Sequence, residues 1–65
     1  MKPTNIKLYD AGEVWCLTFQ YVDQKGKIAD LEHPILAVDT VEQALQEAIE
    51  YFGGLVSKED IEIFV

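Results

Sequence analysis

Arginine is absent from this chain of 65 residues, whose five basic side chains are all lysines and face twelve aspartates and glutamates. The planar guanidinium of arginine makes the paired hydrogen bonds that recognise guanine and phosphate. Without it, and with a net charge of −7, the chain repels a nucleic-acid backbone, so we expect no direct nucleic-acid binding. The same charge favours basic proteins as partners.

Cysteine and long apolar runs are also scarce. A single cysteine, Cys16, cannot form a disulfide within the chain, which indicates a reducing compartment. No apolar run approaches the roughly 18 residues that cross a bilayer, and residues 1–5 are followed by no stretch typical of a signal peptide. We therefore expect a soluble cytoplasmic protein that does not enter membranes.

Candidate catalytic and metal-binding residues are few. One cysteine and one histidine, His33, cannot supply the four nitrogen or sulfur ligands of structural zinc. We interpret His33, beside Pro34 in a polar segment, as an exposed loop residue, and Cys16 as a structural thiol. The pair Gly53–Gly54 follows a predicted helix, whereas phosphate-binding glycines lie at the N-terminus of a helix, so this pair does not predict a phosphate site. We predict no metal, no cofactor and no enzymatic activity.

Three strands are predicted in the N-terminal part. Residues 5–9 alternate in polarity, residues 14–22 are rich in β-branched and aromatic side chains, and the turn signal at residues 10–13 makes them a hairpin. A third strand is predicted to begin near residues 27–28. Because Pro34 lacks an amide hydrogen, it predicts that this strand is a broken or bulged edge strand. One face of the second strand carries the larger apolar and aromatic side chains and is expected to pack on the core. These residues are Trp15, Leu17, Phe19 and Tyr21.

An amphipathic helix follows. Its apolar stripe consists of Val41, Ala44, Leu45, Ala48, Ile49 and Phe52. Asp39 or Thr40 can cap its first turn, with Glu42 or Gln43 at the capping-box spacing. Gly53–Gly54 suits a left-handed C-terminal cap, onto which Leu55 is expected to fold back.

Residues 61–65 alternate again and predict a final strand, after a turn or a single helical turn at residues 57–60. The predicted fold class is therefore α+β, in one small domain over residues 1–65. We expect the order β-β-β-α-β, with an antiparallel sheet of three to four strands and one amphipathic helix packed on one face.

Acidic residues are concentrated in residues 39–65, which contain seven carboxylates and one lysine. Glu50 lies near the predicted helix C-terminus, where the helix dipole disfavours negative charge by about 0.3 to 1 kcal/mol. We hypothesise a small acidic protein-binding or regulatory module that meets a basic partner. The predicted contact residues are Glu42, Gln46, Glu47 and Glu50 on the helix, with Glu59, Asp60 and Glu62 as a second acidic group.

Two alternatives remain open. A dense acidic surface can mimic nucleic acid and inhibit a protein that binds DNA or RNA, although the net charge is low for the roughly 16 phosphates of a duplex of similar length. A homodimer could instead bury the sheet face that one helix cannot shield, which carries Val14, Cys16 and Thr18.

The segment from Asp39 to Leu45, preceded by an aromatic hairpin, resembles the HicB-type antitoxin domain, a small sheet-and-helix module with a similar strand-to-helix junction. The likeness extends over about a third of the chain. The proline- and glycine-rich connection that the family carries between hairpin and helix is absent. The resemblance implies that the protein binds and neutralises a basic toxin.

Overall fold

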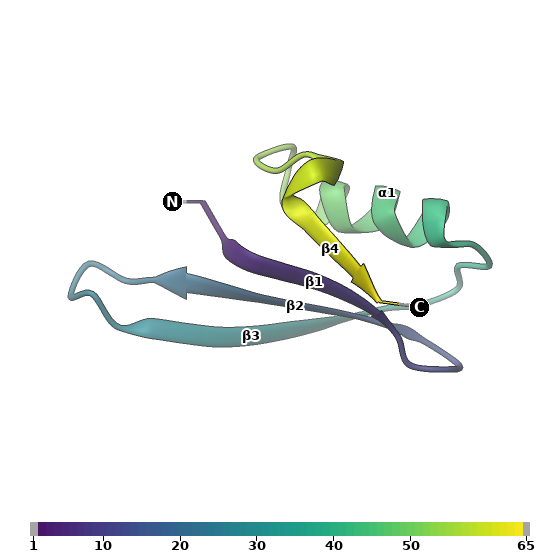
Figure 1. The fold of residues 1–65 in the computed structure, drawn as a ribbon, viewed down its shortest axis with the longest axis horizontal. Helices are drawn as coiled ribbons and strands as arrows, with labels where there is room; N and C mark the ends of the chain where they lie inside the picture. Colours follow the sequence, from purple (N-terminus) through teal and green to yellow (C-terminus); the bar gives the residue numbers. More distant parts are fainter. Residues whose placement is uncertain (1, 65) are drawn as a thin grey trace.

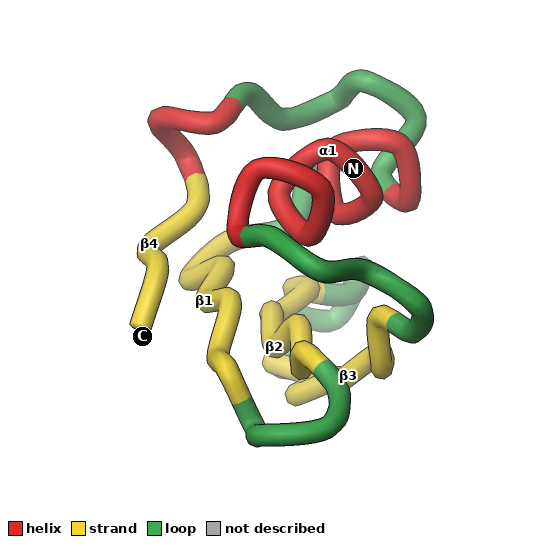
Figure 2. Tube along the Cα trace, turned by 90° about the vertical axis from the view of Figure 1, so that its right-hand side faces the viewer, coloured by secondary structure: helices red, strands yellow, loops and turns green. Residues whose placement is uncertain are grey.

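A four-stranded sheet carries a single helix on one face in the computed structural model, which describes residues 2–64 (Figures 1 and 2). The strand order across the sheet is β3-β2-β1-β4. In chain order the elements are β1 (Thr4–Asp10), β2 (Trp15–Val22), β3 (Ile28–Ile35), α1 (Val41–Tyr51), the 3-10 helix η1 (Lys58–Asp60) and β4 (Ile61–Phe64). The α+β class and the β-β-β-α-β order predicted from the sequence are confirmed.

The predicted hairpin of β1 and β2 is confirmed, and its turn shows why these residues form it. The Asp10 carboxylate accepts a hydrogen bond of 3.0 Å from the Gly12 amide. Gly12 has φ of 97°, a left-handed conformation that costs glycine little and most other residues much more. The turn therefore joins two antiparallel strands whose register pairs Leu8 with Leu17.

β3 is continuous, so the predicted break at Pro34 is wrong. The Asp23 amide donates to the Lys27 carbonyl at 2.9 Å, and hydrogen-bonded and non-hydrogen-bonded pairs alternate from there along the two strands. Counting along the register places Pro34, opposite Cys16, at a non-hydrogen-bonded pair. An amide hydrogen there would point to the free edge of the sheet, so proline removes no bond between β2 and β3.

β4 runs parallel to β1, which corrects the prediction of a purely antiparallel sheet. The register pairs Ile6 with Ile61 and Leu8 with Ile63. Since β3 follows two hairpins, it runs in the same direction as β1. The helix then carries the chain back across the sheet, and β4 must repeat the direction of β1. The sheet is mixed for this reason (Figure 1).

Both ends of α1 have the predicted caps. The Thr40 hydroxyl accepts from the Gln43 amide at 3.2 Å, and the Gln43 side chain accepts from the Thr40 amide at 3.3 Å, which completes a capping box. At the other end the amides of Gly53 and Gly54 donate to the carbonyls of Glu50 and Ile49, the pattern of a Schellman motif.

Leu55, which was expected to fold back onto the last helical turn, has a side chain that is 58% exposed. Val56, one residue later, is buried in the core. Two successive glycines in the left-handed conformation, with φ of 64° and 82°, rotate the chain before it reaches this point.

The core lies between α1 and the sheet. The predicted core face of β2 is confirmed, because Leu17 and Phe19 are buried and Trp15 and Tyr21 pack against them. The buried hydrophobic residues that form the core are Ile6, Leu8, Leu17, Phe19, Ile35, Ala44, Ala48, Phe52, Val56 and Ile61. Among the residues that the structure describes, no helix lies over the opposite face of the sheet (Figure 2). The outer side of α1 and the open sheet face are therefore both exposed to solvent.

Candidate functional site

The outer side of α1 carries the four predicted contact residues of the helix. Glu42, Gln46, Glu47 and Glu50 are all exposed, because the apolar stripe of α1 faces the sheet. The Gln46 side-chain amide donates to the Glu50 carboxylate at 3.3 Å. Among residues 2–64 the ion pair found is the one between Lys2 and Asp60, so the three helix carboxylates face water without an intramolecular cation.

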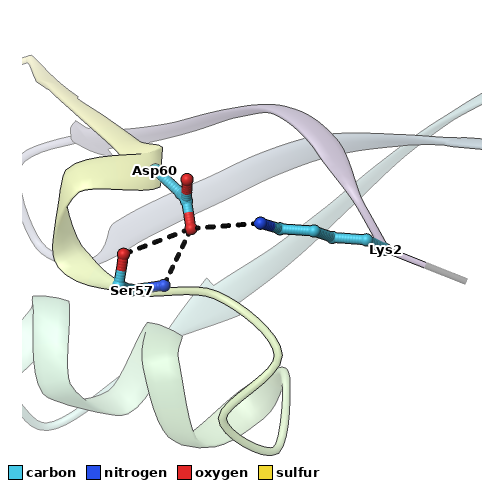
Figure 3. Close-up of polar contacts among 3 residues, drawn as sticks. All are labelled: Lys2, Ser57 and Asp60. Carbon is cyan, nitrogen blue, oxygen red and sulfur yellow. Dashed lines mark hydrogen bonds and ion pairs between the residues drawn. The ribbon is translucent and has the colours of Figure 1, made fainter.

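Asp60, predicted as part of the second acidic group, has a local role in the fold (Figure 3). Its carboxylate accepts hydrogen bonds from the Ser57 amide at 2.9 Å and the Ser57 hydroxyl at 3.3 Å, and it lies 3.5 Å from the Lys2 ammonium. The Ser57 amide, and then the Lys2 charge, lower the pKa of Asp60. The spacing from Ser57 to Asp60 resembles a capping box, a signal in the sequence that could have revealed this role.

The charge of Asp60 is expected to make stability depend on pH. Because its folded pKa lies below the ordinary value of 3.8, ionised Asp60 stabilises the fold above that value, and this contribution disappears as pH falls through the folded pKa. The Asp60→Asn variant should therefore be less stable than the parent protein near neutral pH, with the difference shrinking in acid. Urea unfolding at a series of pH values measures it, and a difference that does not change with pH would contradict the assignment.

The second acidic group does not share one surface with the helix carboxylates. Glu62 pairs in register with Lys7, and it alternates along β4 with buried Ile61, which places Glu62 on the open sheet face. Glu59 lies on η1, where its own backbone amide and the Ser57 hydroxyl lower its pKa. The second acidic group is therefore divided, with Glu59 and Asp60 on η1 and Glu62 on the open sheet face.

A groove between β3 and α1 was missed by the sequence analysis. His33 lies within β3 and is half-buried, so its prediction as an exposed loop residue is wrong. It pairs with Leu17 on the face that meets α1, and its ring stacks on Tyr51 with centroids 4.1 Å apart and an interplanar angle of 20°. The hollow beside this pair has a volume of about 400 Å³ and is lined by His33, Pro34, Ile35, Leu36, Glu47, Glu50 and Tyr51.

The open sheet face has a polar centre. The Gln20 side chain donates to Asp30 at 2.6 Å and accepts from the Asn5 amide group at 3.3 Å. These residues line a hollow of about 490 Å³ together with Lys7 and Glu32, among others. At one edge the rings of Tyr9 and Phe64 stack with centroids 4.9 Å apart. The apolar surface of this face is thus confined to its margins.

Cys16 also lies on the open face. Its thiol is within 4.0 Å of the Glu32 carboxylate, and it pairs in register with Pro34 on β3. Partial burial, followed by the negative charge of Glu32, raises the pKa of Cys16 above 9.0. The thiol therefore stays protonated near neutral pH, which disfavours nucleophilic attack.

Within residues 2–64 no group of three histidine, cysteine, aspartate or glutamate side chains is arranged to hold a metal ion. No helix in the same part of the chain has the length and apolar character needed to cross a membrane. No family model, curated protein or solved structure matches this chain.

Proposed function

We propose that this protein is a small, non-enzymatic binding or regulatory module that contacts a basic protein through the outer side of α1. The supporting observation is the arrangement of Glu42, Glu47 and Glu50, which are exposed on one helix and form no ion pair among residues 2–64. The last turn of α1 contains no basic residue, although a cation there would stabilise the helix. This placement of charge favours intermolecular binding over stability of the isolated fold.

The physical basis of recognition is long-range attraction. Carboxylates on one face raise the local concentration of a cationic partner and accelerate its association. Since the side chains are exposed, salt screens them over a Debye length of about 8 Å at physiological ionic strength. Binding through this face should therefore weaken steeply as salt is added.

The proposal predicts which substitutions abolish capture of a partner. In a pull-down from cell extract, the parent protein should retain a basic protein at low salt and release it at high salt. The triple variant Glu42→Gln, Glu47→Gln, Glu50→Gln should lose about tenfold or more of the captured protein, which corresponds to about 1.4 kcal/mol. The change removes three negative charges and keeps side-chain size.

A matched control separates the helix face from the overall charge. The variant Glu13→Gln, Glu59→Gln, Glu62→Gln removes an equal number of negative charges, at exposed positions outside α1. It should retain most of the captured protein. Equal losses in both variants, or capture that resists salt, would contradict a specific role for the helix face.

The two alternatives receive less support from the geometry. The longest dimension is 39 Å, along which duplex DNA presents roughly 23 phosphate charges, whereas the twelve carboxylates are divided between both sides of the sheet. A homodimer through the open face would bury the polar cluster of Asn5, Gln20 and Asp30. Self-association that survives high salt and fails in Thr18→Lys would support the homodimer.

A further inference from the structure

We infer that the groove between β3 and α1 binds an arginine side chain of the basic partner. This inference rests on the proposed function, because Glu47 and Glu50 belong to both the helix face and the groove. It adds a specific anchor to a general electrostatic surface. The groove combines an exposed aromatic ring, two carboxylates and an apolar margin, and its lining contains no lysine.

The Tyr51 ring is held in place before any partner arrives. It stacks on His33, and its centroid lies 5.8 Å from that of Phe19 and 5.2 Å from that of Phe52. Phe19 and Phe52 are buried in the core, yet Tyr51 remains 47% exposed. A ring ordered by its neighbours loses little conformational entropy when a ligand covers it.

The carboxylates are positioned beside this ring by the helix itself. Glu47 precedes Glu50 by three residues and Tyr51 by four, so the side chain of Glu47 neighbours both of them on the helix surface. At the other wall Pro34 lies near the end of β3 and Leu36 directly follows the strand, and the Leu36 side chain is 63% exposed.

Arginine fits this combination better than lysine. A guanidinium can lie flat on an exposed aromatic ring and at the same time make paired hydrogen bonds to a carboxylate. Its methylene stem can cover the apolar margin formed by Pro34 and Leu36. The ammonium of lysine is a more strongly hydrated point charge, and it has neither the planar face nor the paired donors.

The test is a nuclear magnetic resonance titration of the full chain with three short peptides. The probes are acetyl-Gly-Arg-Gly-amide, the same peptide with lysine, and the same peptide with citrulline, which keeps the planar shape without the charge. We expect saturable shifts at Leu36 and Tyr51 with the arginine peptide, about fivefold weaker binding of the lysine peptide, and no saturation with citrulline.

Two single variants provide a matched comparison on the same helix. Glu47→Gln removes a charge from the groove lining, whereas Glu42→Gln removes one outside it. Binding of the arginine peptide should weaken about fivefold in Glu47→Gln and stay nearly unchanged in Glu42→Gln. Tyr51→Leu, which keeps an apolar side chain, should also weaken binding, and its amide spectrum reports whether the fold is retained.

Several results would overturn the inference. Equal weakening in Glu47→Gln and Glu42→Gln, equal affinity for the arginine and lysine peptides, or shifts spread over all carboxylates would each show a nonspecific counterion effect. If the groove fails these tests while partner capture still depends on the helix carboxylates, the proposed function stands without this anchor. If the groove binds arginine but the triple variant still captures the partner, the proposed function fails.

Discussion

Deletion of residues 61–65 is expected to abolish cooperative unfolding. β4 forms the parallel pairing with β1, and Ile61, only 6% exposed, is part of the core. Loss of a buried isoleucine alone costs about 2 to 5 kcal/mol, and the deletion also removes the hydrogen bonds between β4 and β1. At about 0.05 to 0.15 kcal/mol per residue, a domain of this size has only about 3 to 10 kcal/mol of stability.

The measurement is thermal and urea unfolding, followed by circular dichroism and by the fluorescence of Trp15. Two point variants separate the loss of a buried core contact from the effect of shortening the chain. Ile61→Ala should destabilise strongly, whereas Ile63→Ala, at a position 38% exposed, should cost much less. A truncated protein that keeps a native-like melt would contradict the role assigned to β4.

The second large effect is expected from Leu17→Ala. Leu17 is fully buried on β2, where it pairs with Leu8 on β1 and His33 on β3. Removing three carbons from this position loses transfer free energy and leaves a cavity, at a total cost of about 2 to 5 kcal/mol. For a domain of this size each kcal/mol lowers the melting temperature by about 4 to 8 °C, so the variant should melt at least about 8 °C lower.

Leu55→Ala is the control for this substitution, because it makes the same chemical change at a side chain that is 58% exposed. Its cost should stay within about 0.5 kcal/mol. Similar urea midpoints for Leu17→Ala and Leu55→Ala would show that the core does not lie where the structure places it.

The helix was the part of the fold most open to prediction from sequence. Its apolar stripe, the Thr40 cap and the glycine pair at its end are all local signals that act over three to five residues. The acidic side chains on its outer surface follow from the same period. Their placement on one exposed face is therefore as predictable as the helix.

The alternation of apolar and polar residues predicted the strands, but it did not predict how the strands pair or which side chains meet across the fold. Pro34 was expected to interrupt β3, and only the register shows that its missing amide hydrogen would have faced the free edge. His33 was expected in a loop, whereas its stacking on Tyr51 depends on two elements meeting across the core. Neither relation has a signature within a few residues of either side chain.

The α+β class, the order of the elements, the buried face of β2 and the acidic face of α1 could all be predicted from the amino-acid sequence. These properties follow from local periodicity, capping chemistry and charge. Three further relations emerge from the folded chain: β4 runs parallel to β1, Glu62 lies on the opposite side from the helix carboxylates, and His33 and Tyr51 form a groove with Glu47 and Glu50. Strand direction and the meeting of distant side chains depend on how the chain crosses the sheet, because the packing of the whole core fixes that path and neighbouring residues do not.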